Sequence, residues 1–217
     1  MRPPPPFVHR RTAMWTPVLA LLVGLASSPA LAGSLAYIDQ AGTGNQATQT
    51  QTGGNEASIW QAGIGHRADQ VQVGSNRGMI EQTGQRQHAT MEQTGANAAR
   101  IAQAGAGNRA SVLQDGVANQ ASVIQSGAAN RSSVTQYGSD NHSAMVQRGF
   151  SNQADSVQQG TRNDAVSVQD GKSTLSITQS GSSNSVDSHL YDGAQGLRIQ
   201  QNGNGLDLRI VQTPSHK

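Results

Sequence analysis

The tripeptide Gln-x-Gly returns every ten or eleven residues through most of this 217-residue chain. A fixed period of this kind is typical of repeat proteins, in which each unit stacks on its neighbours. It directs the search for function toward a surface or a polymer, because an enzyme gathers unique residues at one place. The repeated glutamines are Gln40, Gln51, Gln61, Gln72, Gln82, Gln93, Gln103, Gln114, Gln125, Gln136, Gln147, Gln158, Gln169 and Gln179, with a late copy at Gln201.

Each unit alternates between two kinds of side chain. Asn119, Ala121, Val123 and Gln125 occupy every second position of one unit, and the same pattern recurs in its neighbours. A two-residue period predicts a strand with two different sides. The asparagines at the first position of the clearest units are Asn108, Asn119, Asn130, Asn141, Asn152 and Asn163.

A glycine closes each strand, and small or polar residues follow it. Glycine adopts positive φ without a steric penalty, so each unit is expected to be one strand and one tight turn. About seventeen such units fit between Tyr37 and Gln212. The turn glycines are Gly42, Gly53, Gly63, Gly74, Gly84, Gly95, Gly105, Gly116, Gly127, Gly138, Gly149, Gly160, Gly171 and Gly181.

The spacing between glutamines alternates between 11 and 10 residues from Gln40 to Gln103. Alternation means that odd and even turns lie at different places, which indicates a coil of two strands and two turns. The sequence therefore predicts an all-β, amyloid-type β-solenoid of 21–22-residue repeats, with glutamines in two columns about 4.8 Å apart per level. A β-meander is the alternative, since short turns also suit hairpins.

Asparagine and glutamine amides inside such a coil are expected to bond to the same residues above and below. Small apolar residues fill the space between the two layers, at Ile59, Ile80, Ile101, Val112, Val123, Val134, Met145 and Ile177. Ser156 and Ser167 fit this position poorly, so the coils near residues 152–170 are expected to be weaker.

Residues 1–32 differ in composition from the rest. Arg2, Arg10 and Arg11 precede an apolar stretch, and Ala30-Leu-Ala32 has the small residues of a cleavage site. This pattern predicts a secretory signal peptide rather than a membrane anchor, which needs about 20 apolar residues. Its removal would change the 15 basic and 13 acidic residues to 12 and 13, so the net charge falls from +2 to −1. The basic charge of the whole chain is therefore no argument for nucleic-acid binding.

No residues stand out as catalytic or metal-binding. Cysteine is absent, acidic residues are dispersed, and the histidines at 66, 88, 142, 189 and 216 show no metal-site spacing. We expect these histidines to be solvated residues outside the repeat pattern, although His66 occupies an asparagine position. No enzyme activity and no cofactor are expected.

The repeat Gln114-Asp-Gly116-Val-Ala-Asn119-Gln-Ala121, followed by Gln125, resembles that of the curlins, subunits of the curli amyloid fibre of Gram-negative bacteria. Tyr37-Ile-Asp-Gln-Ala-Gly42 and Val134-Thr-Gln-Tyr-Gly138 are similar to the minor, nucleating subunit, and Gln147-Arg-Gly-Phe150 to the major one. The resemblance implies a secreted subunit that polymerises with itself and another curlin into cell-surface fibres for biofilm and adhesion. It also implies a periplasmic chaperone and an outer-membrane secretion channel as partners.

Arg67, His88, Arg109 and Arg131 occupy equivalent positions in alternate strands and are expected to line one outer face. Two interpretations stay open: a solvated face that discourages sideways aggregation, or a surface for an anionic partner such as extracellular DNA or polysaccharide.

The last part of the chain departs from the repeat. Residues 33–184 are expected to form the regular solenoid, and 185–217 degenerate repeats that serve as a cap or an anchor. Tyr191-Asp-Gly193 stands where Gln-x-Gly is expected, and Leu206, Leu208 and Ile210 make the last strand more apolar. For the whole chain, the alternative to a fibre subunit is a monomeric β-solenoid adhesin or ligand-binding module.

Overall fold

The computed structural model describes residues 22–25, 33–194 and 196–213. These ranges contain strands and turns, and no helix in them is long and apolar enough to cross a membrane. The predicted signal peptide lies outside the described residues, apart from 22–25. The strands are β1 (Leu22–Leu25), β2 (Leu35–Thr43), β3 (Gln46–Gly53), β4 (Glu56–Ile64), β5 (Arg67–Gly74), β6 (Arg77–Gln85), β7 (His88–Ala106), β8 (Arg109–Ala128), β9 (Arg131–Ser139), β10 (His142–Phe150), β11 (Gln153–Thr161), β12 (Asp164–Asp170), β13 (Thr174–Ser182), β14 (Ser185–Leu190), β15 (Leu197–Asn204) and β16 (Asp207–Gln212).

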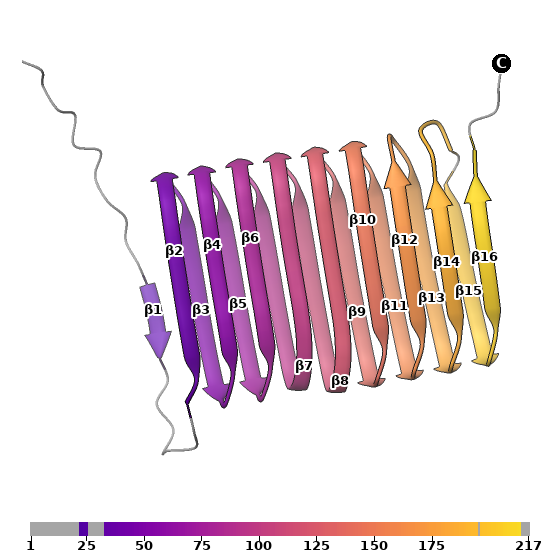
Figure 1. Cartoon of the computed structure of the whole chain (residues 1–217), viewed down its shortest axis with the longest axis horizontal. Coiled ribbons are helices and arrows are strands. Elements are labelled where there is room, and N and C mark those ends of the chain that lie inside the picture. Colours follow the sequence, from indigo (N-terminus) through magenta and orange to yellow (C-terminus); the bar gives the residue numbers. More distant parts are fainter. Residues whose placement is uncertain (1–21, 26–32, 195, 214–217) are drawn as a thin grey trace, which may run out of the picture.

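The strands form a flat coil of two layers (Figure 1). Each strand pairs in parallel with the strand one full coil away, as β2 does with β4 and β3 with β5. The predicted β-solenoid is thus confirmed, because a meander would pair consecutive strands in antiparallel fashion. β7 and β8 each continue around a turn, so each supplies one segment to both layers.

We call the two layers the front sheet and the back sheet, as they lie in Figure 1. The front sheet holds β2, β4, β6, the second halves of β7 and β8, β10, β12, β14 and β16. The back sheet holds β3, β5, the first halves of β7 and β8, β9, β11, β13 and β15, and β1 pairs with its first strand. Equivalent residues are 21 or 22 positions apart, as Gln61 from Gln82 and Gln125 from Gln147.

The space between the sheets is narrow and is filled by small side chains. Ala121 and Val123 are buried, while their neighbours Gln120 and Ser122 face outward. All eight apolar positions expected in the core are buried. A residue's place in the two-residue alternation thus decides whether it is buried.

The apolar core is interrupted at one level of the coil. One cluster of buried apolar residues runs from Ala47 to Ala154, and a second begins at Ala165. Ser156 and Ser167 lie between them, both buried; Ser156 accepts a hydrogen bond from Ser143 at 3.1 Å. Ser167 Oγ is buried without a partner. The expectation of weaker coils at 152–170 stays a prediction, and the gap between the clusters gives it a physical basis.

The register at the last coils corrects one expectation. Leu190, rather than Tyr191, lies beside Gln169 on one side and Gln212 on the other. Asp192 instead approaches Gly171, and its carboxylate accepts a hydrogen bond from the Lys172 backbone N–H at 3.0 Å. The sequence Tyr191-Asp-Gly193 only mimics the repeat, because the alternation carries the inward position to Leu190.

Candidate functional site

The repeated glutamines form two continuous columns of hydrogen-bonded amides. In each column the Nε2 of one glutamine donates to the Oε1 of the next, at 2.7 Å from Gln114 to Gln136 and again from Gln136 to Gln158. The second Nε2 hydrogen is used within the coil, as where Gln136 donates to the Gln120 carbonyl at 3.0 Å. The front column joins Gln40, Gln61, Gln82, Gln103, Gln125, Gln147 and Gln169, and the back column joins Gln51, Gln72, Gln93, Gln114, Gln136, Gln158, Gln179 and Gln201.

The asparagines form a second pair of columns at the turns. Asn119 Oδ1 accepts hydrogen bonds from the backbone N–H of Asn141, at 3.1 Å, and from its Nδ2, at 3.0 Å. Asn119 Nδ2 donates to the carbonyl of Gly138 at 2.9 Å. The amide therefore satisfies a backbone N–H and a backbone carbonyl of the turn on the next level, and its Nδ2 also donates to Asn97 Oδ1 on the preceding level; a buried turn requires such bonds because unpaired backbone groups are costly. Asn108, Asn130, Asn141, Asn152 and Asn163 repeat this arrangement.

Sequence reasoning left out several members of these columns. Asn55, Asn76, Asn97 and Asn184 occupy asparagine positions, and Gln201, which the sequence showed only as a late copy of the repeat, belongs to the back glutamine column. Their spacing from the known members, 21 or 22 residues, would have found them.

Two further glutamines lie at core positions where other coils have isoleucine or valine. Gln49 and Gln70 are buried, and both polar atoms of Gln49 and Oε1 of Gln70 have no hydrogen-bond partner. Gly78 makes room for Gln70, since a Cβ there would overlap the Gln70 amide. The first coils therefore hold the least satisfied part of the core.

His66 is buried inside the asparagine column, contrary to the expectation that it would be solvated. Its backbone N–H donates to Asn45 Oδ1 at 3.0 Å, and the Gln87 backbone N–H lies 3.4 Å from its Nδ1. Because a backbone N–H can only donate, Nδ1 must accept, and Nε2–H then donates to the Ala62 carbonyl at 3.2 Å. Burial lowers the pKa of His66 below its usual 6.5, and the bonds to the Ala62 and Gly84 backbones oppose this shift only in part.

We expect mild acid to destabilise the coil at His66. Its folded-state pKa is depressed, so the unfolded chain binds more protons as the pH falls below about 6.5, and unfolding becomes easier. Above that pH the stabilising contribution of the neutral ring is complete. Urea unfolding of the wild type and of His66→Asn, measured from pH 8 to pH 5, would check this. The asparagine variant should show a shallower loss of stability, and identical pH profiles would contradict the role of His66.

The structure places Arg67, His88, Arg109 and Arg131 side by side on the outer surface of the back sheet. Arg67 is paired with Asp69 at 2.8 Å, whereas the structure shows no ion pair to Arg109 or Arg131 among the described residues. Partial burial, together with Arg67 and Arg109, lowers the pKa of His88, and Asp69 opposes them. A groove of about 500 Å³ runs beside these residues, and the hydroxyl-bearing residues Thr90, Ser111 and Ser133 line its outer surface.

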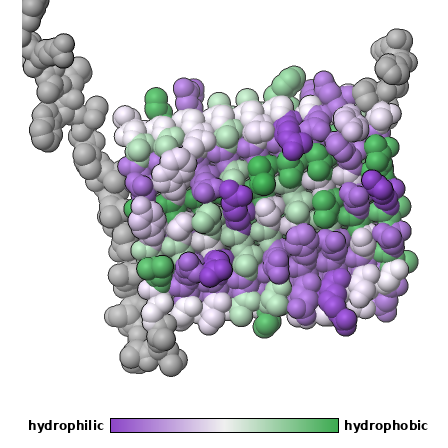
Figure 2. Space-filling view, in the orientation of Figure 1, coloured by the Kyte–Doolittle hydropathy of each residue, from purple (hydrophilic) through white to green (hydrophobic). Residues whose placement is uncertain are grey.

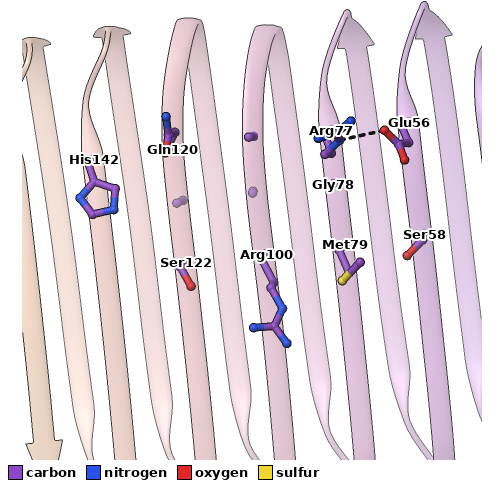
Figure 3. A pocket seen from close by; sticks show the side chains of 12 residues that line it. Glu56, Ser58, Arg77, Gly78, Met79, Arg100, Gln120, Ser122 and His142 are labelled. Carbon is purple, nitrogen blue, oxygen red and sulfur yellow. Dashed lines mark hydrogen bonds and ion pairs between the residues drawn. The ribbon is translucent and has the colours of Figure 1, made fainter.

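The outer surface of the front sheet has a different character. Figure 2 shows apolar side chains among hydrophilic ones on this side, and Ile124, Val146 and Val168 stack there in register. A depression of about 300 Å³ lies over Gly78, Ala98 and Ala99, where side chains are small (Figure 3).

The charged groups around this depression have partners. Arg77 pairs with Glu56 at 2.8 Å, Arg100 with Glu81 at 2.6 Å, and His142 with Asp164 at 2.7 Å. The described residues bring no three His, Asp or Glu side chains into a group that could hold a metal ion. The chemistry available here is hydrogen bonding and packing between equivalent residues.

Comparison with known proteins supports the same reading of the repeat. Residues 105–138 and 116–149 each match the family model for the curlin associated repeat. No curated protein and no solved structure matches the chain. The two matches are offset by 11 residues, which is one strand, so the family pattern fits a stretch that starts in either sheet.

Proposed function

We propose that this chain, in which residues 105–149 match the curlin associated repeat, is a secreted structural subunit of a curli-type amyloid fibre for biofilm matrix and adhesion. Residues 1–32 are the signal peptide, 33–184 the assembling solenoid, and 185–217 a divergent end. The partners are other copies of the chain, a second curlin subunit, a periplasmic chaperone and an outer-membrane channel. The fibre lies on the surface of a Gram-negative cell.

The observation that carries this proposal is the state of the two ends of residues 33–213. β2 and β16 each have a neighbour on one side only, and core residues there, such as Ile38, Leu208 and Ile210, are half-buried. Globular repeat proteins cover such ends with polar capping units. Exposed strand edges attached to a bare core favour addition of another chain, which gives cross-β stacking.

Fibre formation by the protein without residues 1–32 tests the proposal. We expect unbranched fibres that bind amyloid dyes and diffract at about 4.8 and 10 Å, the spacings of strands and sheets. A protein that stays monomeric at high concentration and gives no such reflections would instead favour the monomeric adhesin or ligand-binding module.

A second function rests on the back-sheet surface. Arg109 and Arg131 lie on neighbouring strands beside a hydroxyl-lined groove, and arginine pairs readily with phosphate and carboxylate groups. An anionic polymer such as extracellular DNA or an acidic polysaccharide suits this surface, with a solvated face as the alternative.

The double variant Arg109→Ala plus Arg131→Ala should weaken binding of DNA fragments to assembled fibres and reduce its salt dependence, because two charge contacts are lost. Co-sedimentation at several salt concentrations measures this. Arg77→Ala plus Arg100→Ala, on the front sheet, is the matched control with equal charge loss. Equal effects of both pairs, or binding that ignores salt, would remove this function.

The divergent end fits a nucleating or anchoring subunit. Leu190 interrupts the front glutamine column, and this end carries Arg198 and Arg209, the latter paired with Asp187 at 3.4 Å. A chain ending before Ser185 should release fibres into the medium if this end anchors them to cells. Fibres that remain cell-bound but assemble differently would indicate a cap.

A further inference from the structure

The solenoid has an odd number of strand segments. Among residues 33–213, β2 to β16 are fifteen strands, and β7 and β8 each pass through both sheets, which makes seventeen segments. The first segment, β2, and the last, β16, both lie in the front sheet. The front sheet therefore has nine segments and the back sheet eight.

The odd number of segments determines how a second copy can stack on the C-terminal end of the first without leaving an empty strand position in the back sheet. If the next copy were only translated along the axis, its β2 would pair with β16, but its β3 would lie two levels from β15. Two levels are about 9.6 Å, too far for backbone hydrogen bonds. A half-turn about the axis removes the gap, because the β2 of the next copy then pairs with β15 and its β3 with β16.

The half-turn requires that either sheet can continue into the other. Their inward residues follow one pattern, as Asn108, Ala110, Val112 and Gln114 in the back sheet show when compared with residues 119–125 in the front sheet. The two curlin-repeat matches, one strand apart, also fit both. The interiors of the two sheets thus follow the same pattern in these coils, and Gln49 and Gln70 of the back sheet depart from it.

The ends of the glutamine columns are complementary. Along both columns Nε2 donates toward the higher-numbered glutamine, so at the first level Gln40 Oε1 and Gln51 Oε1 have no partner. At the last level Gln201 Nε2 donates to the carbonyls of Ser185 and Leu206, and it has to give up the Leu206 carbonyl in order to donate to a further glutamine as Gln179 does. The half-turn aligns Gln201 with Gln40 of the next copy and Gln212 with its Gln51.

Residues of β15 match those of β2 of the next copy, whereas Ile210 of β16 would lie on Gln49 of its β3. The same register places Ile199 on Ile38 and Gly203 on Gly42 of the next copy. At interior turns such as Gly181, a Cβ would overlap the carbonyl oxygen of the next glycine, whereas at Gly203 it would meet only Leu206 Cδ1, at 3.6 Å. β1 already occupies, in parallel, the slot beside β3 that β16 of the preceding copy would fill.

We infer that this chain assembles head to tail with a half-turn between successive copies, so that the front sheet of one copy continues into the back sheet of the next. The inference rests on the proposed fibre function and adds its symmetry. One consequence is that the Arg109–Arg131 surface alternates between opposite sides of the fibre from one copy to the next.

Disulfide trapping between copies tests the symmetry, because the natural chain has no cysteine. The half-turn register places Gln200 beside Asp39 of the next copy, and Val211 beside its Thr50. Neighbouring strands bring such residues within the Cα separation of about 4.4–6.8 Å that a disulfide needs. Within one copy, Asp39 and Gln200 lie about eight levels, or roughly 38 Å, apart and cannot pair.

Fibres of Asp39→Cys plus Gln200→Cys, oxidised and then dissolved in denaturant, should give a ladder of disulfide-linked oligomers on a non-reducing gel. Fibres of Thr50→Cys plus Val211→Cys should give the same ladder. The matched control, Asp39→Cys plus Val211→Cys, should stay monomeric, since it would cross-link only under translation without rotation. A ladder in the control alone would overturn the half-turn and leave the fibre function standing. If the wild type forms fibres but none of the three cysteine pairs gives cross-linked oligomers, end-to-end stacking is overturned. If the wild type forms no fibres, the proposed function itself is rejected.

Discussion

Alanine at Gly127 is expected to destabilise the solenoid more than any surface substitution. Gly127 has φ of 105°, and a Cβ there would overlap the carbonyl oxygen of Gly149 on the next level. The clash involves backbone on both sides, so no side-chain rotation relieves it. Backbone strain and overpacking each cost about 1–3 kcal/mol, and together they predict a loss of about 3–5 kcal/mol.

Gly107→Ala is the matched control for this experiment. Gly107 also has positive φ, at 65°, but no atom lies within 4 Å of the place where its Cβ would be. Ala129 and Ser151 occupy the equivalent turn position two and four strands later with φ of 56° and 58°. The backbone therefore already accepts alanine here, and the variant should lose only about 1 kcal/mol.

Urea unfolding followed by far-UV circular dichroism would compare the two variants with the wild type. A large decrease in the urea concentration at the unfolding midpoint for Gly127→Ala, with a small decrease for Gly107→Ala, supports a steric requirement between levels. Equal losses would mean that chain flexibility in the turn, rather than contact between levels, explains the glycines.

The alternation and the period were enough to predict the coil, its two glutamine columns and its core. They succeed because a two-residue period fixes which side chains point inward, and equal spacing brings equivalent positions together at every level. No single residue carries the fold, so local deviations do not obscure it.

Predictions failed where residue type was given more weight than position. His66 was expected to be solvated because histidine did not fit the repeat, yet its position placed it in the buried column. Gln49 and Gln70 were overlooked for the same reason, as polar residues at apolar positions. Tyr191-Asp-Gly193 was misaligned because its glycine resembles a repeat, although Leu190 has the correct spacing. The repeat pattern does not predict which polar atoms at the two ends of the solenoid lack a hydrogen-bond partner; only the structure shows them.

Leucine at Gln158 is expected to break the back column, whereas leucine at the adjacent Gln159 should be tolerated. Gln158 is buried, accepts from Gln136 at 2.7 Å, and donates to the His142 carbonyl at 2.7 Å and to Gln179 at 2.8 Å. Leucine cannot make these bonds, and each buried group left unpaired costs about 1–3 kcal/mol. Part of this cost is offset by the added apolar burial, so we expect a net loss of about 3 kcal/mol.

Gln159 is exposed on the outer side of the same strand, and its side chain makes no hydrogen bond within the described structure. Gln159→Leu should therefore change stability by no more than about 0.5 kcal/mol, as surface substitutions usually do. The two neighbouring glutamines differ in little except the side of the strand that they occupy. If both variants unfold at the same urea concentration, the amide columns contribute nothing, and packing of small residues alone would have to hold the levels together.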